Sequence, residues 1–279
     1  MSDTDKYAVF GNPIKHSKSP VIHTAFAEQC HQDMQYRAVR VELDGFERTV
    51  ASFFGSGGRG LNITVPFKQR AFELADECTA RARSAGAVNT LLQDVSGALL
   101  GDNTDGIGLV RDMVANLGWS LRGQRILILG AGGAVRGVLK PLLEEKPRSL
   151  TIANRTAERA SELATRFGEL GMVDGGSYER IKGRQFDLVI NASSAGLRGE
   201  MPELPGTLLT ERSCCYDMVY GNEPTVFMRW AALHAAWAVA DGLGMLVEQA
   251  AESFYRWRRV RPATGPVIQL LRQGLATQQ

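Results

Sequence analysis

Lys68 follows a segment that could place hydrogen-bonding groups along one face of a strand. Residues 61–70 read LNITVPFKQR, and the neutral polar side chains Asn62 and Thr64 alternate there with apolar ones. The apolar members are Leu61, Ile63 and Val65. This period of two predicts a strand that ends at Pro66, which cannot donate to a ladder. An ammonium beside an amide and a hydroxyl suits a polar substrate; an edge strand with a solvated face is the alternative.

A glycine-rich turn follows a continuously apolar strand in residues 125–137 (RILILGAGGAVRG). A strand before such a turn and a helix after it are the context that the dinucleotide-binding fingerprint requires. Gly130 would permit the tight turn, and Gly132 would let a pyrophosphate approach the free N–H groups of the helix. Val135 stands where the fingerprint has Gly or Ala, so the strict pattern is not met. A glycine-rich turn without a ligand is the alternative.

The end of the next strand bears on the choice of cofactor. An NAD site has Asp or Glu there, about 20 residues after the glycines, to bind the ribose 2′-hydroxyl. This chain instead has Asn154, Arg155 and Thr156, with Arg159 one helical turn further. Guanidinium and hydroxyl groups suit a 2′-phosphate, which a carboxylate would repel. We therefore expect NADP(H) rather than NAD(H), even if Asn154 and Thr156 also cap the helix.

Composition excludes several classes of protein. The chain has 279 residues, 44% of them hydrophobic and 22% charged, with a formal net charge of +2. This balance gives no reason to expect a nucleic-acid or membrane partner. The four cysteines show no metal-ligand spacing, the histidines form no ligand cluster, and the adjacent cysteine pair is a poor disulfide candidate. We expect a cytoplasmic protein without a metal.

The order of the expected helices and strands differs between two parts of the chain. Up to Asp105 we expect a mixed α/β unit, and beyond it a regular strand–helix beat, which indicates a doubly wound parallel sheet. Expected strands of the first part are residues 7–12, 36–43 and 61–65, with a hairpin over 88–101; its helices are 21–32, 46–54 and one after Pro66. Expected strands of the second part are 125–129, 150–153, 186–191, 214–218 and 238–240; its helices are 107–117, 134–145 and 156–167.

Eight motifs in this order resemble the shikimate dehydrogenase family over essentially the whole chain. They are Lys15–Pro20 (KHSKSP), Asn62–Lys68 (NITVPFK), Ala85–Thr90 (AGAVNT), Gly101–Gly106 (GDNTDG), Gly130–Ala134 (GAGGA), Asn154–Thr156 (NRT), Tyr216–Met218 (YDM) and Asp241–Val247 (DGLGMLV). The resemblance implies reversible NADPH-dependent reduction of 3-dehydroshikimate to shikimate, a step in aromatic amino-acid biosynthesis.

The resemblance also implies a substrate site and a catalytic pair. The substrate-binding residues it implies are Ser17, Ser19, Asn62, Thr64, Lys68, Asn89, Asp105, Tyr220 and Gln249. Lys68 would protonate the oxygen that becomes negative during hydride transfer, and Asp105 would orient that lysine. His16 is the rival acid/base, but the family uses its loop for binding. The cofactor-binding residues implied by the motifs and their neighbours are Gly130, Ala131, Gly132, Gly133, Ala134, Asn154, Arg155, Thr156, Arg159, Met218 and Gly242.

The fold implied by the resemblance has two domains. A substrate domain would take residues 1–105 and be completed by 243–279, and a Rossmann-like NADP-binding domain would take 106–242. A broader quinate/shikimate dehydrogenase is one alternative, and a non-catalytic NADP(H)-binding sensor is another. A homodimer is left open, because no clear interface stripe is visible in the sequence.

Overall fold

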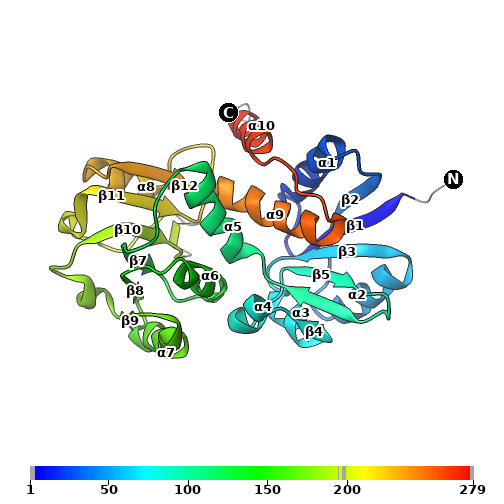
Figure 1. Cartoon of the computed structure of the whole chain (residues 1–279), viewed down its shortest axis with the longest axis horizontal. Coiled ribbons are helices and arrows are strands. Elements are labelled where there is room, and N and C mark those ends of the chain that lie inside the picture. The colour runs from blue at the N-terminus through cyan, green and yellow to red at the C-terminus, as the bar shows by residue number, and fades with distance from the viewer. Residues whose placement is uncertain (1–3, 194, 197–198, 277–279) are drawn as a thin grey trace. The chain divides into compact units, whose positions relative to one another are not determined.

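The computed structural model describes residues 4–193, 195–196 and 199–276, which form two compact units (Figure 1). The first unit contains the chain up to Gly108 together with Val247–Gln269, and the second contains Leu109–Leu246 together with the chain from Leu270. These boundaries lie close to the expected ones after residues 105 and 242. They differ in grouping the chain from Leu270 with the second unit.

The first unit contains a mixed six-stranded sheet. Its strands, in spatial order, are β2 (Met34–Arg40), β1 (Asp5–Gly11), β3 (Gly58–Ile63), β5 (Thr90–Gln93), β6 (Leu99–Asp102) and β4 (Glu77–Cys78). Strand β1 is parallel to both of its neighbours, whereas β5 is antiparallel to β3 and β6. The expected hairpin is therefore confirmed, and the first unit contains both helices and strands as predicted.

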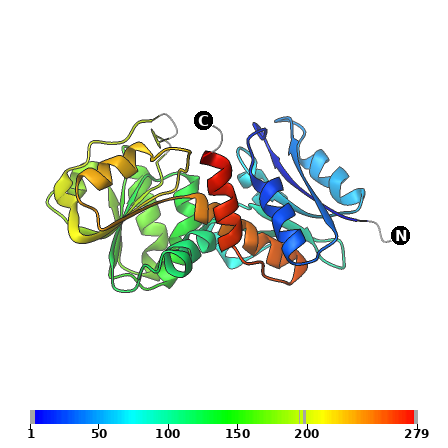
Figure 2. The same ribbon diagram turned by 90° about the horizontal axis from the view of Figure 1, so that it is seen from above.

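Helices cover both faces of this sheet, and the alternation of side chains in β1 explains why. Ala8 and Phe10 pack with Phe46 of α2 (Phe46–Gly55), while Tyr7 and Val9 face the opposite side. Figure 2 shows α1 (Ser19–Gln29) and α2 on opposite sides of the strands. The remaining helices with residues in this unit are α3 (Lys68–Leu74), α4 (Ala80–Ala85), α5 (Asp105–Arg111), α9 (Leu243–Arg258) and α10 (Gly265–Ala276).

The predicted end of the strand before Lys68 was wrong, and with it the place of Val65 on the apolar face. Strand β3 ends at Ile63, so Thr64 and Val65 lie beyond it, and Val65 is 61% exposed instead of part of an apolar face. The polar face of β3 is not solvated, because Asn62 is buried. The alternative of a solvated edge strand therefore fails, and β3 is an inner strand of the sheet.

The second unit contains a six-stranded sheet in which all pairs are parallel. Its strands, in spatial order, are β12 (Ala238–Asp241), β11 (Leu209–Asp217), β10 (Phe186–Asn191), β7 (Arg125–Leu129), β8 (Ser149–Ala153) and β9 (Val173–Gly176). The chain starts at β7, proceeds outward to β9 and then crosses back to β10. In doubly wound sheets of this kind, ligands bind beyond the carboxyl ends of the strands at this switch point.

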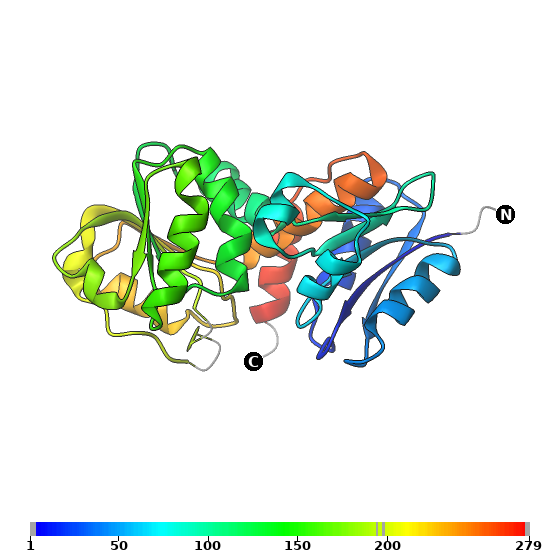
Figure 3. The same cartoon turned by 90° about the horizontal axis from the view of Figure 1, so that it is seen from below.

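The apolar residues 126–129 of β7 are buried on both faces of the sheet, which is why they lack alternation. Ile126 and Ile128 pack with α6 (Gly133–Glu144) and α7 (Ala157–Phe167), which lie beside each other in Figure 3. Leu127 and Leu129 pack on the other face, with α8 (Val226–Leu233). Helix α5 continues into a π-helical turn, Asp112–Asn116, where one uninterrupted helix was expected.

Among the elements that were not expected are α4, β4, β9 and α8. Helix α4 reads ARARSA, which has no apolar stripe of helical period, and β4 has only two residues. Strand β9 reads VDGG, a composition that disfavours strands. In the described part of the chain, no helix is both long and apolar enough to cross a bilayer.

We expect Gly175→Ala to destabilise the second unit. A Cβ at Gly175 in β9 would lie 2.2 Å from the backbone oxygen of Ala160 in α7, so the helix would have to move. The expected loss is about 1–3 kcal/mol of unfolding free energy, measured by urea denaturation. Gly168→Ala is the matched control, because its backbone is helical and no atom lies within 4 Å of the added Cβ. Equal effects of the two substitutions would contradict this account.

Candidate active site

Lys68 and Asp105 each begin a helix, α3 and α5, and their side chains meet. The Lys68 Nζ lies 2.6 Å from Asp105 Oδ2, and the two side chains are 31% and 15% exposed. The backbone oxygen of Lys68 accepts a hydrogen bond from the Val88 N–H, which ties the start of α3 to the chain before β5. The structure therefore brings together an ammonium and a carboxylate that are far apart in the sequence, at a place that solvent still reaches.

Asn89 joins this pair to α9. Its Nδ2 donates to Asp105 Oδ1 at 2.8 Å and to Thr104 Oγ1 at 2.9 Å, and it lies 3.3 Å from Gln249 Oε1. Its Oδ1 accepts from the Thr104 N–H at 2.9 Å. The amide is thus held in one orientation, and it links four of the residues named in the sequence analysis: Lys68, Asn89, Asp105 and Gln249.

Asn62 lies beneath Asn89, and both atoms of its amide are hydrogen-bonded within the protein. Its Oδ1 accepts from the Tyr36 hydroxyl at 2.7 Å, and its Nδ2 donates to the Asn89 oxygen at 3.1 Å and to Ser253 Oγ at 3.0 Å. At 6% exposure, Asn62 is placed to support Asn89. The implied contact of Asn62 with the substrate stays a prediction.

Sequence reasoning missed the supporting residues of this buried polar layer. They are Tyr36, Thr90, Thr104 and Ser253, of which the last three are also hydrogen-bonded to one another or to Asn89. A signal was present for Ser253, which lies four residues after Gln249 on α9 and so shares its face. Nothing in the sequence pattern marked Tyr36, because its role depends on the pairing of β1 with β2 and β3.

Ser17 and Ser19 lie at the start of α1, and Thr64 directly follows β3 in the same unit. Ser17 Oγ accepts from the Ser19 N–H at 3.3 Å, just at the start of α1, and Ser19 is buried. The Thr64 backbone is fixed by its N–H bond to the Phe10 oxygen. Its hydroxyl has no hydrogen-bond partner within the described residues, so it can still accept or donate a bond to a ligand. His16 is exposed.

His23 lies one helical turn after Ser19 and is completely buried. Its ring stacks on Tyr36 with centroids 4.2 Å apart and an interplanar angle of 7°. Neither ring nitrogen has a hydrogen-bond partner among the residues that the structure describes. Burial lowers the pKa of His23 to about 3, so the imidazole is neutral at neutral pH.

The glycine turn of the second unit has the features that a pyrophosphate needs. Gly130 has φ +112°, and a Cβ there would lie 3.1 Å from the Ala192 oxygen, so the position requires glycine. Gly132 and Gly133 have no atom within 4 Å of an added Cβ. Helix α6 starts here without a side-chain cap, which leaves its first N–H groups open to an anion.

The helix that follows β8, α7, also starts without a side-chain cap. Thr156 precedes α7 but its side chain makes no capping bond, and Asn154 Nδ2 donates instead to the Thr156 oxygen. Arg155 and Arg159 are exposed, and within the described chain neither has a carboxylate partner. Other arginines of this unit do: Arg125 pairs with Asp187, and Arg180 and Arg184 pair with Asp174. Two uncapped helix starts and two unpaired guanidinium groups fit a dinucleotide with an additional phosphate.

Met218 and Gly242 follow β11 and β12 at the same edge of the sheet. A Cβ on Gly242 would lie 2.2 Å from the Met218 oxygen, so only glycine permits this approach. The Met218 N–H donates to the Asn191 oxygen, and the Gly242 N–H donates to the Val219 oxygen. Tyr220 is partly buried, and burial raises the pKa of its phenol. Tyr220 belongs to the second unit, apart in the chain from the other implied substrate residues.

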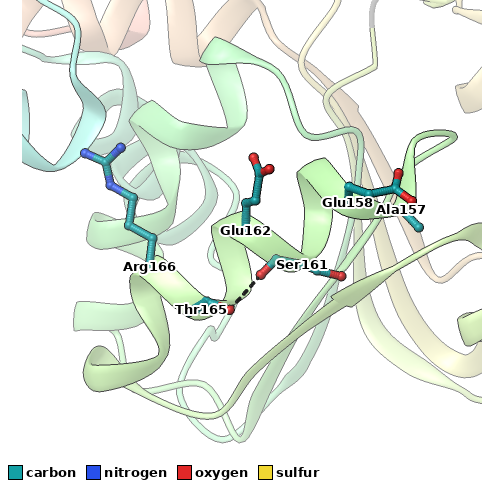
Figure 4. A pocket seen from close by; sticks show the side chains of 6 residues that line it. All are labelled: Ala157, Glu158, Ser161, Glu162, Thr165 and Arg166. Carbon is teal, nitrogen blue, oxygen red and sulfur yellow. Dashed lines mark hydrogen bonds between the residues drawn. The ribbon is translucent and has the colours of Figure 1, made fainter.

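A hollow lies along the outer face of α7, lined by Ala157, Glu158, Ser161, Glu162, Thr165 and Arg166 (Figure 4). None of the residues implied as site residues lines it, although Ala157 and Glu158 stand between Thr156 and Arg159 in the chain. Within the described chain, no group of three or more His, Cys, Asp or Glu side chains could hold a metal ion.

The buried His23 predicts a loss of stability in acid. Its pKa is about 3 in the folded state and about 6.5 in the unfolded state, so protons bind first to the unfolded chain as the pH falls. The free energy of unfolding should therefore drop by about 2 kcal/mol between pH 7 and pH 5 on account of this residue. Urea denaturation at both pH values should show a shallower pH dependence for His23→Phe. Parallel curves for the two proteins would contradict the assignment.

Comparison with known proteins identifies the family. Three sequence models match: "Shikimate dehydrogenase substrate binding domain" over residues 9–91, "Shikimate / quinate 5-dehydrogenase" over 112–197 and "Shikimate 5'-dehydrogenase C-terminal domain" over 242–272. The shikimate dehydrogenase (NADP(+)) of Cellvibrio japonicus is 58% identical over 272 residues, which is 98% of each chain.

Solved structures with the same fold support this family assignment. The Ael1 enzyme from Pseudomonas putida is 46% identical, with a TM-score of 0.90 over 96% of this chain and 98% of that one. Shikimate 5-dehydrogenase from Thermus thermophilus, solved in complex with NADP(H) and shikimate, is 32% identical, with a TM-score of 0.86 over 97% of this chain and 100% of that one. The sequence models, the identity over nearly the full length and the shared two-unit α/β fold lead to one conclusion: the chain belongs to the shikimate dehydrogenase family.

Proposed function

We propose that the chain catalyses the reversible, NADPH-dependent reduction of 3-dehydroshikimate to shikimate, in the shikimate pathway of aromatic amino-acid biosynthesis. The observation that carries the proposal is the Lys68–Asp105 pair at 2.6 Å, held by Asn89 and bordered by Gln249. Such a pair suits protonation of an oxygen during carbonyl reduction. The identity of 58% to a shikimate dehydrogenase (NADP(+)) over 98% of each chain supports the choice of substrate.

Lys68 acts as the general acid in reduction. As the carbonyl carbon is reduced, negative charge develops on its oxygen, and the Lys68 ammonium stabilises that charge and then donates its proton. In the reverse direction, neutral Lys68 accepts the proton of the alcohol. Asp105 limits the positions that the Lys68 Nζ can take, because it is itself fixed through Asn89.

The other polar groups of the first unit bind the ring. We assign the carboxylate to the hydroxyls of Ser17 and Ser19, and ring oxygens to the remaining members of the set. These are Asn62, Thr64, Asn89, Asp105, Gln249 and, from the second unit, Tyr220. Neutral donors are sufficient for a carboxylate that water also reaches. The unpartnered Thr64 hydroxyl supports its assignment more directly than the Asn62 amide does, because that amide is already hydrogen-bonded within the protein.

The second unit binds NADP(H), which supplies the hydride for reduction or accepts it in the reverse reaction. The turn Gly130–Ala134 and the uncapped start of α6 receive the pyrophosphate. Asn154, Arg155, Thr156 and Arg159 receive the adenosine 2′-phosphate. The absence of a carboxylate from this set distinguishes it from an NAD site. Met218 and Gly242 border the nicotinamide.

The two units take the two tasks, so we propose that the first is the substrate domain and the second the cofactor domain. A cytoplasmic location is also part of the proposal. It is supported by the four cysteines, all of which are free.

A broader quinate/shikimate dehydrogenase is the second candidate. One of the matching sequence models carries quinate in its description, and quinate differs from shikimate by an added ring hydroxyl. A non-catalytic NADP(H) sensor would retain the cofactor residues and lose the reacting pair, and the contact between Lys68 and Asp105 argues against it.

The test is to offer shikimate and quinate, each with NADP+ and with NAD+, and to follow reduction of the nicotinamide by absorbance. Turnover of shikimate with NADP+ in clear preference to the other three combinations supports the proposal. Comparable turnover of quinate assigns the broader activity. Binding of NADPH without any turnover would refute catalysis.

Lys68→Met should lower kcat by about 100-fold or more, because the variant lacks the group that transfers the proton. The Michaelis constant for shikimate should change much less, since the ring keeps its other hydrogen bonds. Steady-state kinetics measure both quantities. Lys6→Met is the control, because Lys6 is an exposed lysine of the same unit on β1. A rise of the Michaelis constant alone would make Lys68 a binding residue.

Arg155→Met should weaken NADP+ selectively. Loss of a guanidinium that pairs with a phosphate should raise the Michaelis constant for NADP+ by about tenfold and leave that for NAD+ unchanged. Arg212→Met is the matched control, since Arg212 is an exposed arginine of β11 in the same unit. Equal effects on the two cofactors would show that Arg155 does not read the 2′-phosphate.

A further inference from the structure

Asp217 is a buried carboxylate that the proposed reaction does not use. It is the last residue of β11, is 0% exposed and directly precedes Met218. In the described part of the chain no lysine or arginine pairs with it. This distinguishes it from Asp241 at the corresponding position of β12, which forms two bonds to Arg272. An uncompensated buried carboxylate is costly, so its hydrogen bonds must explain why it is there.

Three neutral donors bind the Asp217 carboxylate. Oδ1 accepts from the Val219 N–H at 3.0 Å and from Asn191 Nδ2 at 3.1 Å, while Oδ2 accepts from Thr225 Oγ1 at 2.5 Å. The donors come from the end of β10, from the loop after β11 and from the residue that precedes α8. One side chain therefore connects both ends of the β11–α8 loop to the end of β10, at the carboxyl edge of the sheet.

Each donor is itself held in place. Asn191 Oδ1 accepts from the N–H and the hydroxyl of Ser193, so its Nδ2 is the group that turns to Asp217. Thr225 Oγ1 accepts from the Met228 N–H and caps α8 while its proton goes to Asp217. The network thus has a single consistent assignment of donors and acceptors.

The segment closed by this network is residues 218–224. It contains Met218 and Tyr220, assigned above to the nicotinamide and the substrate. The Met218 N–H also donates to the Asn191 backbone oxygen, and the Val219 backbone oxygen accepts from the Gly242 N–H. The Asp217–Val219 bond lies between Met218 and Tyr220 in the chain, so the carboxylate holds the backbone that bears both side chains.

We propose that Asp217 is a positioning residue that fixes the loop bearing Met218 and Tyr220 for hydride transfer, without contributing to the adenosine end of the cofactor site. The proposal rests on the function proposed above. Removal of the carboxylate should then impair turnover and the use of shikimate. Binding at Gly130–Ala134 and at Asn154–Thr156 should be unaffected, since those residues follow β7 and β8 and, within the described chain, share no hydrogen bond with Asp217.

The experiment compares Asp217→Ala with Asp217→Asn. Asparagine can still accept from Val219 and Asn191 through Oδ1 and can donate to Thr225, whose hydroxyl can reverse its role. Alanine removes all three bonds. We expect kcat to fall about 100-fold in Asp217→Ala, as for misplaced reacting groups, and to remain within about threefold of wild type in Asp217→Asn. The Michaelis constant for shikimate should rise only in the alanine variant.

The second readout is the affinity for 2′,5′-ADP, measured by calorimetry, because this ligand carries the adenosine phosphates without nicotinamide. Its Kd should be unchanged within about twofold in both variants. A parallel loss of 2′,5′-ADP affinity in Asp217→Ala would make Asp217 a general structural residue and overturn the proposal. So would wild-type turnover by Asp217→Ala, or equal damage by asparagine and alanine.

Thr225→Val and Thr225→Ser keep the proposal testable if Asp217→Ala does not fold. Valine removes the bond to Oδ2, so kcat should fall about tenfold, whereas serine retains it and should behave as wild type. Equal turnover by the two variants would overturn the proposal. A wild-type protein that binds 2′,5′-ADP but does not oxidise shikimate would instead refute the proposed function.

Discussion

The first unit is organised by the need of its buried polar groups for partners. Asn89 is 2% exposed, so each of its donors and acceptors must find a bond within the protein. It finds them in Thr104, Asp105 and Gln249, and Asn62 then supports it from below. A side chain with so many hydrogen bonds has one orientation. Asn89 therefore holds the Asp105 carboxylate in place, and that carboxylate holds the Lys68 ammonium.

In the second unit, by contrast, polar groups at the starts of α6 and α7 are left without partners in the described chain. Helix α8 is capped by Thr225, whereas α6 and α7 begin uncapped at the carboxyl ends of β7 and β8 in a parallel sheet. Within the described chain, Arg155 and Arg159 stay unpaired beside them while other arginines of the unit hold carboxylates. Open N–H groups and free cations at one edge make that edge attractive to phosphate. Asp217 lies at the same carboxyl edge, at the end of β11, and its hydrogen bonds hold a loop that must keep one conformation.

The fold class and most elements could be predicted, because the hydrophobic period of a segment and the Gly or Pro residues at its ends are local features of the sequence. The apolar run 125–129 and the glycines after it predicted a buried strand and a βα turn, and both are present. Elements without a local signal were missed, such as α4 with its ARARSA sequence. The assignment of Val65 to an apolar face was wrong because alternation continues in the letters after β3 has ended at Ile63.

Residue types and their order by themselves determined the family and the classes of chemistry. A lysine after NITVP and an arginine in place of the acidic residue after the second strand of the Rossmann-like unit are properties of the sequence. The tertiary structure alone decided which of these residues meet. Lys68 and Asp105 are 37 positions apart, and Asn62 and Ser253 are 191 apart. Such contacts depend on strand pairing and helix packing, which no local period encodes, and so the supporting roles of Tyr36 and Asp217 emerged only from the fold.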